Sequence, residues 1–294
     1  AGIPAYAAGY FGSRDITIMH SVVDLSGLNE LTRAFLKQGA GAICGMVACS
    51  DGPVSPDASQ RLVAVSSFRF SETCSQEVIR ELERRGYGVI PFHAQGVGEN
   101  AMEDLIAQEL FVGVVDVVPA GLGEQILGGN RAARAERLEA AGRVGIPQVI
   151  STSGFDMISC GPLDRRDRGD PLWTSRRLAE RKYVVPDRFR VEVRTTAGEV
   201  SEIAHRVAEK LNRAKGPVTV VIPTSGWSSL SVAGADLYDP DADAAFVPAL
   251  RERLNASIRV EEVDVELNTQ SFGHLLASTL DEMIQHQSTE ADAK

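Results

Sequence analysis

The chain has 294 residues, of which 44% are hydrophobic and 24% are charged, and this composition is typical of a globular protein with a substantial core. Its formal net charge of -10 argues against general binding to nucleic acids or anionic membranes, because both need basic patches. With no membrane-length apolar run and no signal-peptide pattern, we expect a cytoplasmic protein. The four cysteines include no CxxC pair and no histidine at zinc-ligand spacing, so we expect reduced thiols and no metal site.

Residues 1–50 differ in pattern from the rest of the chain. A short β-branched run at residues 15–20 predicts a strand, and the apolar spacing of residues 28–47 predicts a helix. A linker rich in Pro, Ser and Asp follows at residues 50–59. The chain begins without Met in a Gly/Tyr-rich stretch, so we expect this segment to be the remnant or connector of a missing first domain.

From residue 60 to residue 286, short apolar runs alternate with helical patterns. Runs that are apolar at every position are typical of parallel strands covered by helices on both faces, with right-handed crossovers between them. We therefore predict a Rossmann-like α/β domain with a doubly wound, mostly parallel sheet. The predicted strands are 62–68, 88–93, 112–118, 147–151, 190–194, 218–223 and 258–267, and the predicted helices are 73–85, 99–111, 122–127, 131–144, 200–212, 239–254 and 271–284.

Two stretches do not follow this alternation. The Arg/Asp-rich segment at about residues 160–187 contains Trp173 and several turn signals, which predict an inserted loop or flap. Residues 287–294 are polar and predict a frayed tail.

Ligands of an open parallel sheet bind beyond the carboxyl ends of its strands, so the residues that follow the predicted strands are candidates for a site. Most of these loops are small and carry hydroxyl groups. Loops of this kind let backbone N–H groups approach an anion at a helix N-terminus. The candidate binding residues are Ser71, Thr73, Gln95, Gly96, Gly98, Glu99, Asn100, Gly121, Ser151, Ser153, Gly154 and Asp156.

The loop that follows His93 is the leading candidate. Gly96 and Gly98 stand between a predicted strand and a predicted helix, which suits a cradle for phosphate or carboxylate. The loop is not a full GxGxxG motif, because Ala101 replaces the third glycine, and the alternative is that the glycines make only a tight turn. His93 itself would suit acid/base catalysis at neutral pH. The alternative is a histidine that is hydrogen-bonded to a neighbouring loop.

Several separate motifs together resemble one family. They are SRDITIMHSVVDLSGLNELTR, GAGAICGMV, FHAQGVGENAMEDLI, RLEAAGRVGIPQVIS, GFDMISCGP, AEKLNRAKGPVTVVIP and YDPDADAAFVPALRERL. In this order they resemble the second half of the family of the tomato mosaic virus resistance protein and its uncharacterised bacterial relatives. The resemblance covers residues 9–284, which is nearly the whole chain.

The resemblance implies a two-domain α/β protein that binds ATP and forms a homodimer or higher assembly. In the plant member it also implies binding to a viral replication protein. The family's first domain carries a GTSG-type motif that this chain lacks, which implies that a missing half completes the ATP site. Three features depart from the family: His20 in place of Tyr, residues 68–72 in place of a loop of the form Gly-Val-Thr-Thr, and a longer segment at residues 164–185.

Two function classes remain open. The first is a protein that binds a nucleotide or another small phosphate or carboxylate compound, within an enzyme of unassigned reaction or outside one. The alternative is a protein-interaction or assembly module without catalysis. The many polar groups at the predicted ligand edge favour the first class, because a surface used for protein contact more often exposes aromatic or Arg side chains among apolar groups.

Overall fold

The computed structural model describes residues 27–50 and 61–292, together with residues 12, 14, 16–19 and 21. It divides into two units, Ala1–Ser59 and Gln60–Lys294. In the first unit, helix α2 spans Glu30–Ala48, and Asn29 caps it by accepting the N–H of Thr32 at 3.0 Å.

This helix matches the one predicted at residues 28–47. Residues 16–19 form no strand, in contrast to the prediction for residues 15–20. Residues 15 and 20, and residues 51–59 of the predicted linker, lie outside the described residues.

The second unit is built on a six-stranded sheet in which every pairing is parallel. In spatial order, its strands are β2 (Gly88–His93), β1 (Leu62–Ser67), β3 (Gly113–Asp116), β4 (Gln148–Ile150), β8 (Val218–Pro223) and β9 (Arg259–Val263). The chain runs outward from β1 to β2 and then returns past β1 to β3. The winding direction therefore reverses between β1 and β3, which is where ligands bind in doubly wound folds. The predicted fold class is confirmed.

Helices cover both faces of this sheet. One face carries α3 (Glu72–Arg84) and α12 (Gln270–Asp292), and the other carries α4 (Val97–Ile106), α5 (Ala120–Leu127), α6 (Ala140–Val144), α9 (Ala197–Leu211) and α11 (Phe246–Arg253). Val63 and Val65 of β1 pack into the core beneath α3 and α12, while Ala64 packs into the core beneath α4 and α6. Burial on both sides explains why the strands are apolar at successive positions.

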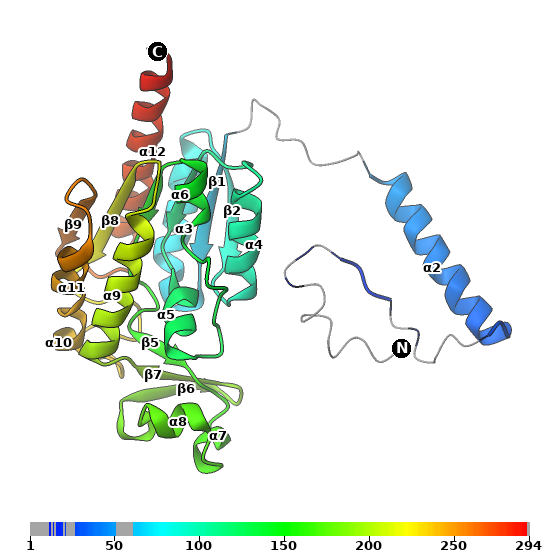
Figure 1. Cartoon of the computed structure of the whole chain (residues 1–294), viewed down its shortest axis with the longest axis horizontal. Coiled ribbons are helices and arrows are strands. Elements are labelled where there is room, and N and C mark those ends of the chain that lie inside the picture. Colours follow the sequence, from blue (N-terminus) through cyan, green and yellow to red (C-terminus); the bar gives the residue numbers. More distant parts are fainter. Residues whose placement is uncertain are drawn as a thin grey trace. The chain divides into compact units, whose positions relative to one another are not determined.

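A second, antiparallel sheet follows β4. It has the order β5 (Met157–Ser159), β7 (Arg190–Arg194) and β6 (Tyr183–Asp187). Two short helices, α7 (Asp164–Asp167) and α8 (Pro171–Ser175), come between β5 and β6 in the sequence. Figure 1 shows this small sheet and its helices beyond the end of the main sheet at which the parallel strands finish. The segment predicted as an inserted loop at residues 160–187 thus contains two short α-helices, a 3-10 helix at Leu178–Glu180 and a strand. The predicted strand at 190–194 pairs within the small sheet.

Four predicted helices differ clearly from the observed ones. The helix predicted at residues 99–111 is α4, which ends at Ile106. Only Ala140–Val144 of the helix predicted at residues 131–144 is helical, and Leu138 has a φ of 73° that interrupts any helix before it. The helix predicted at residues 239–254 is two helices, α10 (Pro240–Asp243) and α11. Helix α12 continues past the predicted end of the helix at residue 284. Among the residues that the structure describes, no helix is both long and apolar enough to cross a membrane.

Candidate functional site

Side chains join the carboxyl ends of β1 and β3, where the winding direction reverses. Ser66 donates its hydroxyl to Asp116 Oδ1 at 2.7 Å, and the same hydroxyl oxygen accepts the N–H of Val118 at 2.8 Å. Ser66 and Asp116 are both buried. The two central strands therefore end in polar groups that are already bonded to each other.

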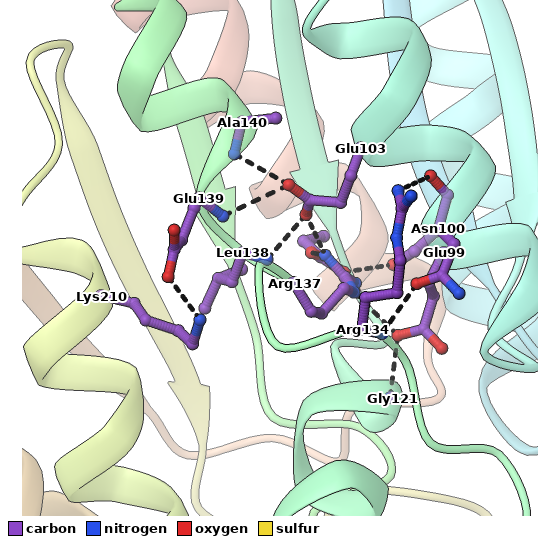
Figure 2. A network of polar contacts seen from close by, with 12 residues as sticks. Glu99, Asn100, Glu103, Gly121, Arg134, Arg137, Leu138, Glu139, Ala140 and Lys210 are labelled. Carbon is purple, nitrogen blue, oxygen red and sulfur yellow. Dashed lines mark hydrogen bonds and ion pairs between the residues drawn. The ribbon is translucent and has the colours of Figure 1, made fainter.

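Arg137 extends this contact into a buried network (Figure 2). Its guanidinium lies 2.6 Å from Asp116, 2.9 Å from Glu99 and 3.1 Å from Glu103. Burial by itself lowers the pKa of Arg137, but the three carboxylates outweigh it and hold that pKa well above its ordinary value. Burial raises the pKa of Glu99 even though Arg137 is beside it. The charged groups of Arg137, Asp116, Glu99 and Glu103 therefore bind one another inside the protein.

The carboxylates of the network also accept backbone N–H groups (Figure 2). Glu103 accepts those of residues 138–140 at 2.7, 3.3 and 2.8 Å, and so caps the N-terminus of α6 from a different helix. Glu99 accepts the N–H of Gly96 at 3.1 Å and that of Gly121 at 2.8 Å. Three of the predicted binding residues, Gly96, Glu99 and Gly121, thus bind one another.

Close packing explains the glycines of the leading candidate loop. A Cβ added to Gly98 would lie 2.2 Å from the carbonyl oxygen of His93, and one added to Gly96 would lie 2.8 Å from that of Ala132. Gly96 also has a φ of 71°, a conformation that side chains disfavour. This geometry matches the alternative interpretation, in which the loop makes a tight turn between β2 and α4.

Three consecutive hydroxyl side chains follow β4. Ser151, Thr152 and Ser153 are at most 1% exposed. No described residue forms a hydrogen bond with any of the three hydroxyl groups. Unpaired buried hydroxyls are rare, because each costs about 1–3 kcal/mol. The end of β4 therefore holds unused hydrogen-bonding capacity that a polar ligand or ordered waters would satisfy.

Gly154 and Asp156 set the path of the chain after these hydroxyls. Gly154 has a φ of 83°, and a Cβ there would lie 2.5 Å from the Cβ of Ala120. Asp156 accepts the N–H of Gly154 at 3.0 Å and the hydroxyl of Ser228 at 2.6 Å. Asp156 thereby ties the loop after β4 to the loop after β8.

The loop between β1 and α3 contributes an exposed cation. Arg69 is exposed, and among the described residues its guanidinium lies only over the ring of Phe70, 5.8 Å from the ring centre. Ser71 stands at the N-cap of α3, but its hydroxyl donates to the carbonyl oxygen of Phe68 at 3.2 Å and does not cap the helix. An arginine beside a helix N-terminus favours an anion there. Thr73 is exposed in the first turn of the same helix.

The other predicted residues belong to β2, to the turn after it and to α4. His93 ends the edge strand β2, is exposed, and stands in register with Ser67. Its ring has no hydrogen-bond or ion-pair partner among the described residues. Asn100 accepts the N–H of Arg134 at 2.9 Å, and so joins α4 to the segment before α6. Gln95 is half-buried in the turn between β2 and α4.

A second group of buried charges was missed from the sequence. Arg131 lies 3.0 Å from Glu124 and 2.7 Å from Glu192, and it stacks on the ring of Phe68 with 5.1 Å to the ring centre. Burial raises the pKa of Glu192 to about 7. Arg131 belongs to an Ala- and Arg-rich stretch that has the composition of an exposed helix, so only its partners, far away in sequence, reveal its role.

Metal ligation has no candidate in the described part of the chain. Across residues 27–50 and 61–292, no group of three or more His, Cys, Asp or Glu side chains is placed to hold a metal ion.

The comparisons with known proteins match nearly the whole chain. The family model described as the Uncharacterised protein family (UPF0261) C-terminal domain matches residues 60–284, and the model of the N-terminal domain of the same family matches residues 5–51. A UPF0261 protein of Clostridium tetani is 33% identical over 279 residues, which are 94% of this chain and 66% of that protein. The ToMV resistance protein Tm-1(GCR237) of Solanum lycopersicum is 31% identical over 275 residues, which are 92% of this chain and 35% of that protein.

The chain therefore spans only part of the length of these relatives. Among solved structures, an uncharacterized protein from Bacillus cereus ATCC 10987 aligns with a TM-score of 0.34 and 9% identity, over 87% of this chain and 70% of that chain. The two family models and the bacterial and tomato relatives confirm the resemblance found in the motifs. The chain belongs to the uncharacterised protein family UPF0261.

Proposed function

We propose that this chain binds a small phosphate-bearing molecule at the carboxyl edge of its main sheet, with a nucleotide as the leading candidate. The observation that carries the proposal is the row of unpartnered buried hydroxyls at Ser151, Thr152 and Ser153. They follow a central strand of a doubly wound sheet, at the edge where such folds bind ligands. Hydroxyl groups donate to phosphate oxygens and also accept from ribose or base groups.

One feature of the β1–α3 loop favours a phosphate over a neutral ligand: the exposed Arg69 has no carboxylate partner among the described residues. The hydroxyl of Ser71 does not cap α3, but Asn268 Oδ1 accepts the N–H of Cys74 in the first turn of that helix at 3.3 Å. The choice of a nucleotide comes from the family resemblance, which implies ATP. The missing first domain, the homodimer and the cytoplasmic location stay predictions.

The hydroxyls of residues 151–153 are sealed from solvent, so binding requires movement of the segments that cover them. The loop after β1 and the loop after β8 are bonded to each other through Phe70 and Ser229. Because β3 and β4 lie between β1 and β8, this bond spans the ends of the two middle strands. We expect these two loops to part when the ligand enters.

The test is calorimetric titration of the chain with ATP, ADP and inorganic phosphate, each against wild type and the double variant Ser151→Ala/Ser153→Ala. The double variant should weaken binding by at least about tenfold, since each lost hydrogen bond to a charged group is worth about 1.5–3 kcal/mol. It should not weaken the fold, because neither hydroxyl has a partner in the protein.

Ser66→Ala is the matched control. The Ser66 hydroxyl bonds to Asp116 and to the N–H of Val118, so this variant should lose stability and keep its affinity for the ligand. Equal affinity in wild type and the double variant would remove the hydroxyls from the site. Absence of binding to all three phosphate compounds would overturn the proposal and favour the protein-interaction alternative. A crystal structure with only ordered waters on the three hydroxyls, at saturating ATP, would do the same.

A further inference from the structure

A cavity of about 280 Å³ lies at the carboxyl end of β8, next to α10 and the start of α11. It lies at the opposite side of the sheet from β1. Its lining includes Ile222, Pro223, Trp227, Asp243, Val247 and Glu262. None of these residues belongs to the hydroxyl row after β4 or to the β1–α3 loop, so the cavity is separate from the site proposed above.

Several residues of the cavity wall are conformationally restrained. Three of its lining residues are prolines, Pro223, Pro240 and Pro248, whose rings fix φ. Trp227 is 1% exposed, donates its indole N–H to the carbonyl oxygen of Pro223 at 3.1 Å, and packs edge-on against Phe246 with 5.4 Å between ring centres. Restrained wall residues lose little conformational freedom when a ligand binds, which lowers the entropic cost of binding.

The cavity contains the carboxylate of Asp243, and only one of its two oxygens accepts a hydrogen bond from a described residue. The Asp243 side chain is 10% exposed, and its Oδ1 accepts a hydrogen bond from Arg194 at 2.5 Å. No described residue bonds to its Oδ2. Burial raises the pKa of Asp243 to about 7 although Arg194 is beside it, and the nearby Asp156 and Asp239 contribute to the rise. Arg194 contacts only one of the two carboxylate oxygens, so a positively charged group at Oδ2 would be stabilised by the carboxylate.

The other lining residues also favour a positively charged ligand. Glu262 is the second ionisable residue of the wall, and it is 3.2 Å from Arg251 at the surface. None of the residues that line the cavity is Lys, Arg or His. An anion would thus meet two carboxylates in the lining, each paired with one arginine from outside it. A cation would meet the free oxygen of Asp243 and the indole of Trp227, a ring type whose face attracts positive charge.

We propose that this cavity binds a small organic cation, a protonated amine on a compact apolar body, with the amine toward Asp243 and the body against Trp227 and Val247. The volume limits the ligand to about the size of one substituted ring, which is near the lower end for small-molecule sites. A neutral molecule of the same shape would leave the free oxygen of Asp243 without a positively charged partner. A carboxylate would be repelled.

The probes are benzylamine, benzyl alcohol and benzoate, which share one ring and differ in charge. Each is titrated into the full chain at pH 7.5, and binding is followed by ¹⁵N-indole NMR shifts of Trp227, with Trp173 as an internal reference. Benzylamine should shift the Trp227 signal and bind at least about tenfold more tightly than benzyl alcohol, and benzoate should not bind. Equal affinity for the amine and the alcohol would overturn the assignment, as would no binding by any probe.

Two variants locate the binding. Asp243→Asn keeps the shape and removes the charge, so it should reduce the preference for the amine to less than threefold. Because this variant also breaks the contact with Arg194, Val247→Phe provides a second test that fills the cavity and leaves that contact intact. It should abolish binding of benzylamine. Glu261→Gln, on β9 but outside the cavity lining, is the control and should change affinity by less than about threefold. Unchanged benzylamine binding in Val247→Phe would overturn the proposal.

Discussion

Ser229 donates its backbone N–H to the carbonyl oxygen of Phe70 at 2.9 Å, and this bond joins loops whose strands are separated by two others in the sheet. The loops after β1 and β8 meet across the ends of β3 and β4. The hydroxyls of residues 151–153 are sealed from solvent at the same edge. One backbone hydrogen bond on an exposed residue thus contributes to closing the edge of the sheet.

Ser229→Pro should loosen this closure, because proline has no N–H to donate. We expect hydrogen exchange at the amides of Gly154 and Phe155 to accelerate at least about tenfold, while exchange in β1 and β3 stays unchanged. Ser229→Ala is the matched control, since it keeps the N–H and should exchange like wild type. Equal rates in the proline and alanine variants would show that the bond does not hold the loops together.

Arg137→Met should destabilise the protein strongly. It leaves Glu99, Glu103 and Asp116 buried without their shared cation, and breaking a buried ion pair in this way typically costs about 3–5 kcal/mol. The exposed Arg134, which pairs with Asp104, supplies the control: Arg134→Ala should cost less than about 1 kcal/mol. Urea unfolding of both variants measures the difference. Similar midpoints for the two would contradict a supporting role for the network.

Gly98→Ala should lower the free energy of unfolding by about 1–3 kcal/mol, the usual effect of overpacking, because its Cβ would lie 2.2 Å from the carbonyl oxygen of His93. Gly198, in the first turn of α9, offers a glycine with open space, where the nearest atom to an added Cβ is 4.0 Å away. Gly198→Ala should therefore stabilise by up to about 1 kcal/mol. Thermal unfolding distinguishes the two, and a tolerated Gly98→Ala would mean that the turn after β2 relaxes easily.

The stability of the protein should fall as pH rises from about 4.5 to about 7. Burial raises the pKa of Glu192 from 4.5 to about 7, so over this interval the folded protein holds a proton that the unfolded chain has released. Each such proton contributes a slope of up to about 1.4 kcal/mol per pH unit. Glu192→Gln should remove its share of the slope and gain stability at pH 8 relative to pH 5.

Urea midpoints between pH 5 and pH 8 measure that slope. Glu202→Gln, at an exposed position of α9, is the control and should run parallel to wild type. A slope in Glu192→Gln as steep as that of wild type would mean that Glu192 is ionised throughout.

Much of the parallel sheet could be predicted because burial on both faces leaves a signal at every position of a strand, as in β8 at residues 218–223, which is buried throughout. The edge strand β2 also has its predicted bounds, residues 88–93, although only Phe92 of it is buried. Of the small sheet, β7 was predicted as a strand at residues 190–194. Its partners β5 and β6 were not, since β5 has three residues and β6 lies in an Arg/Asp-rich segment. These two strands are identified by their pairing with β7, and pairing between distant residues cannot be read from local composition.

The candidate site, too, could be predicted only in part from the sequence. The rule that ligands bind where strands end located Ser151 and Ser153, but the missing hydrogen bonds that make them notable depend on every neighbour. Glu99 looked like a loop residue at a helix start, yet its carboxylate is buried against Arg137. The Ala-rich composition of residues 131–139 favours a helix. Two inward-facing arginines, Arg131 and Arg137, override that preference by pairing with carboxylates from other elements.

The hydrogen bonds that Glu103 accepts from the start of α6 affect the order in which the helices form during folding. Helix α6 has only five residues, too few to be stable in water alone, and its first N–H groups find their acceptor on α4. A peptide cut from this region would lack that acceptor and stay unstructured. The helix therefore forms only after a contact across more than thirty residues of sequence has been made. Helix α6 is thus expected to form after α4 has packed against it, and not before.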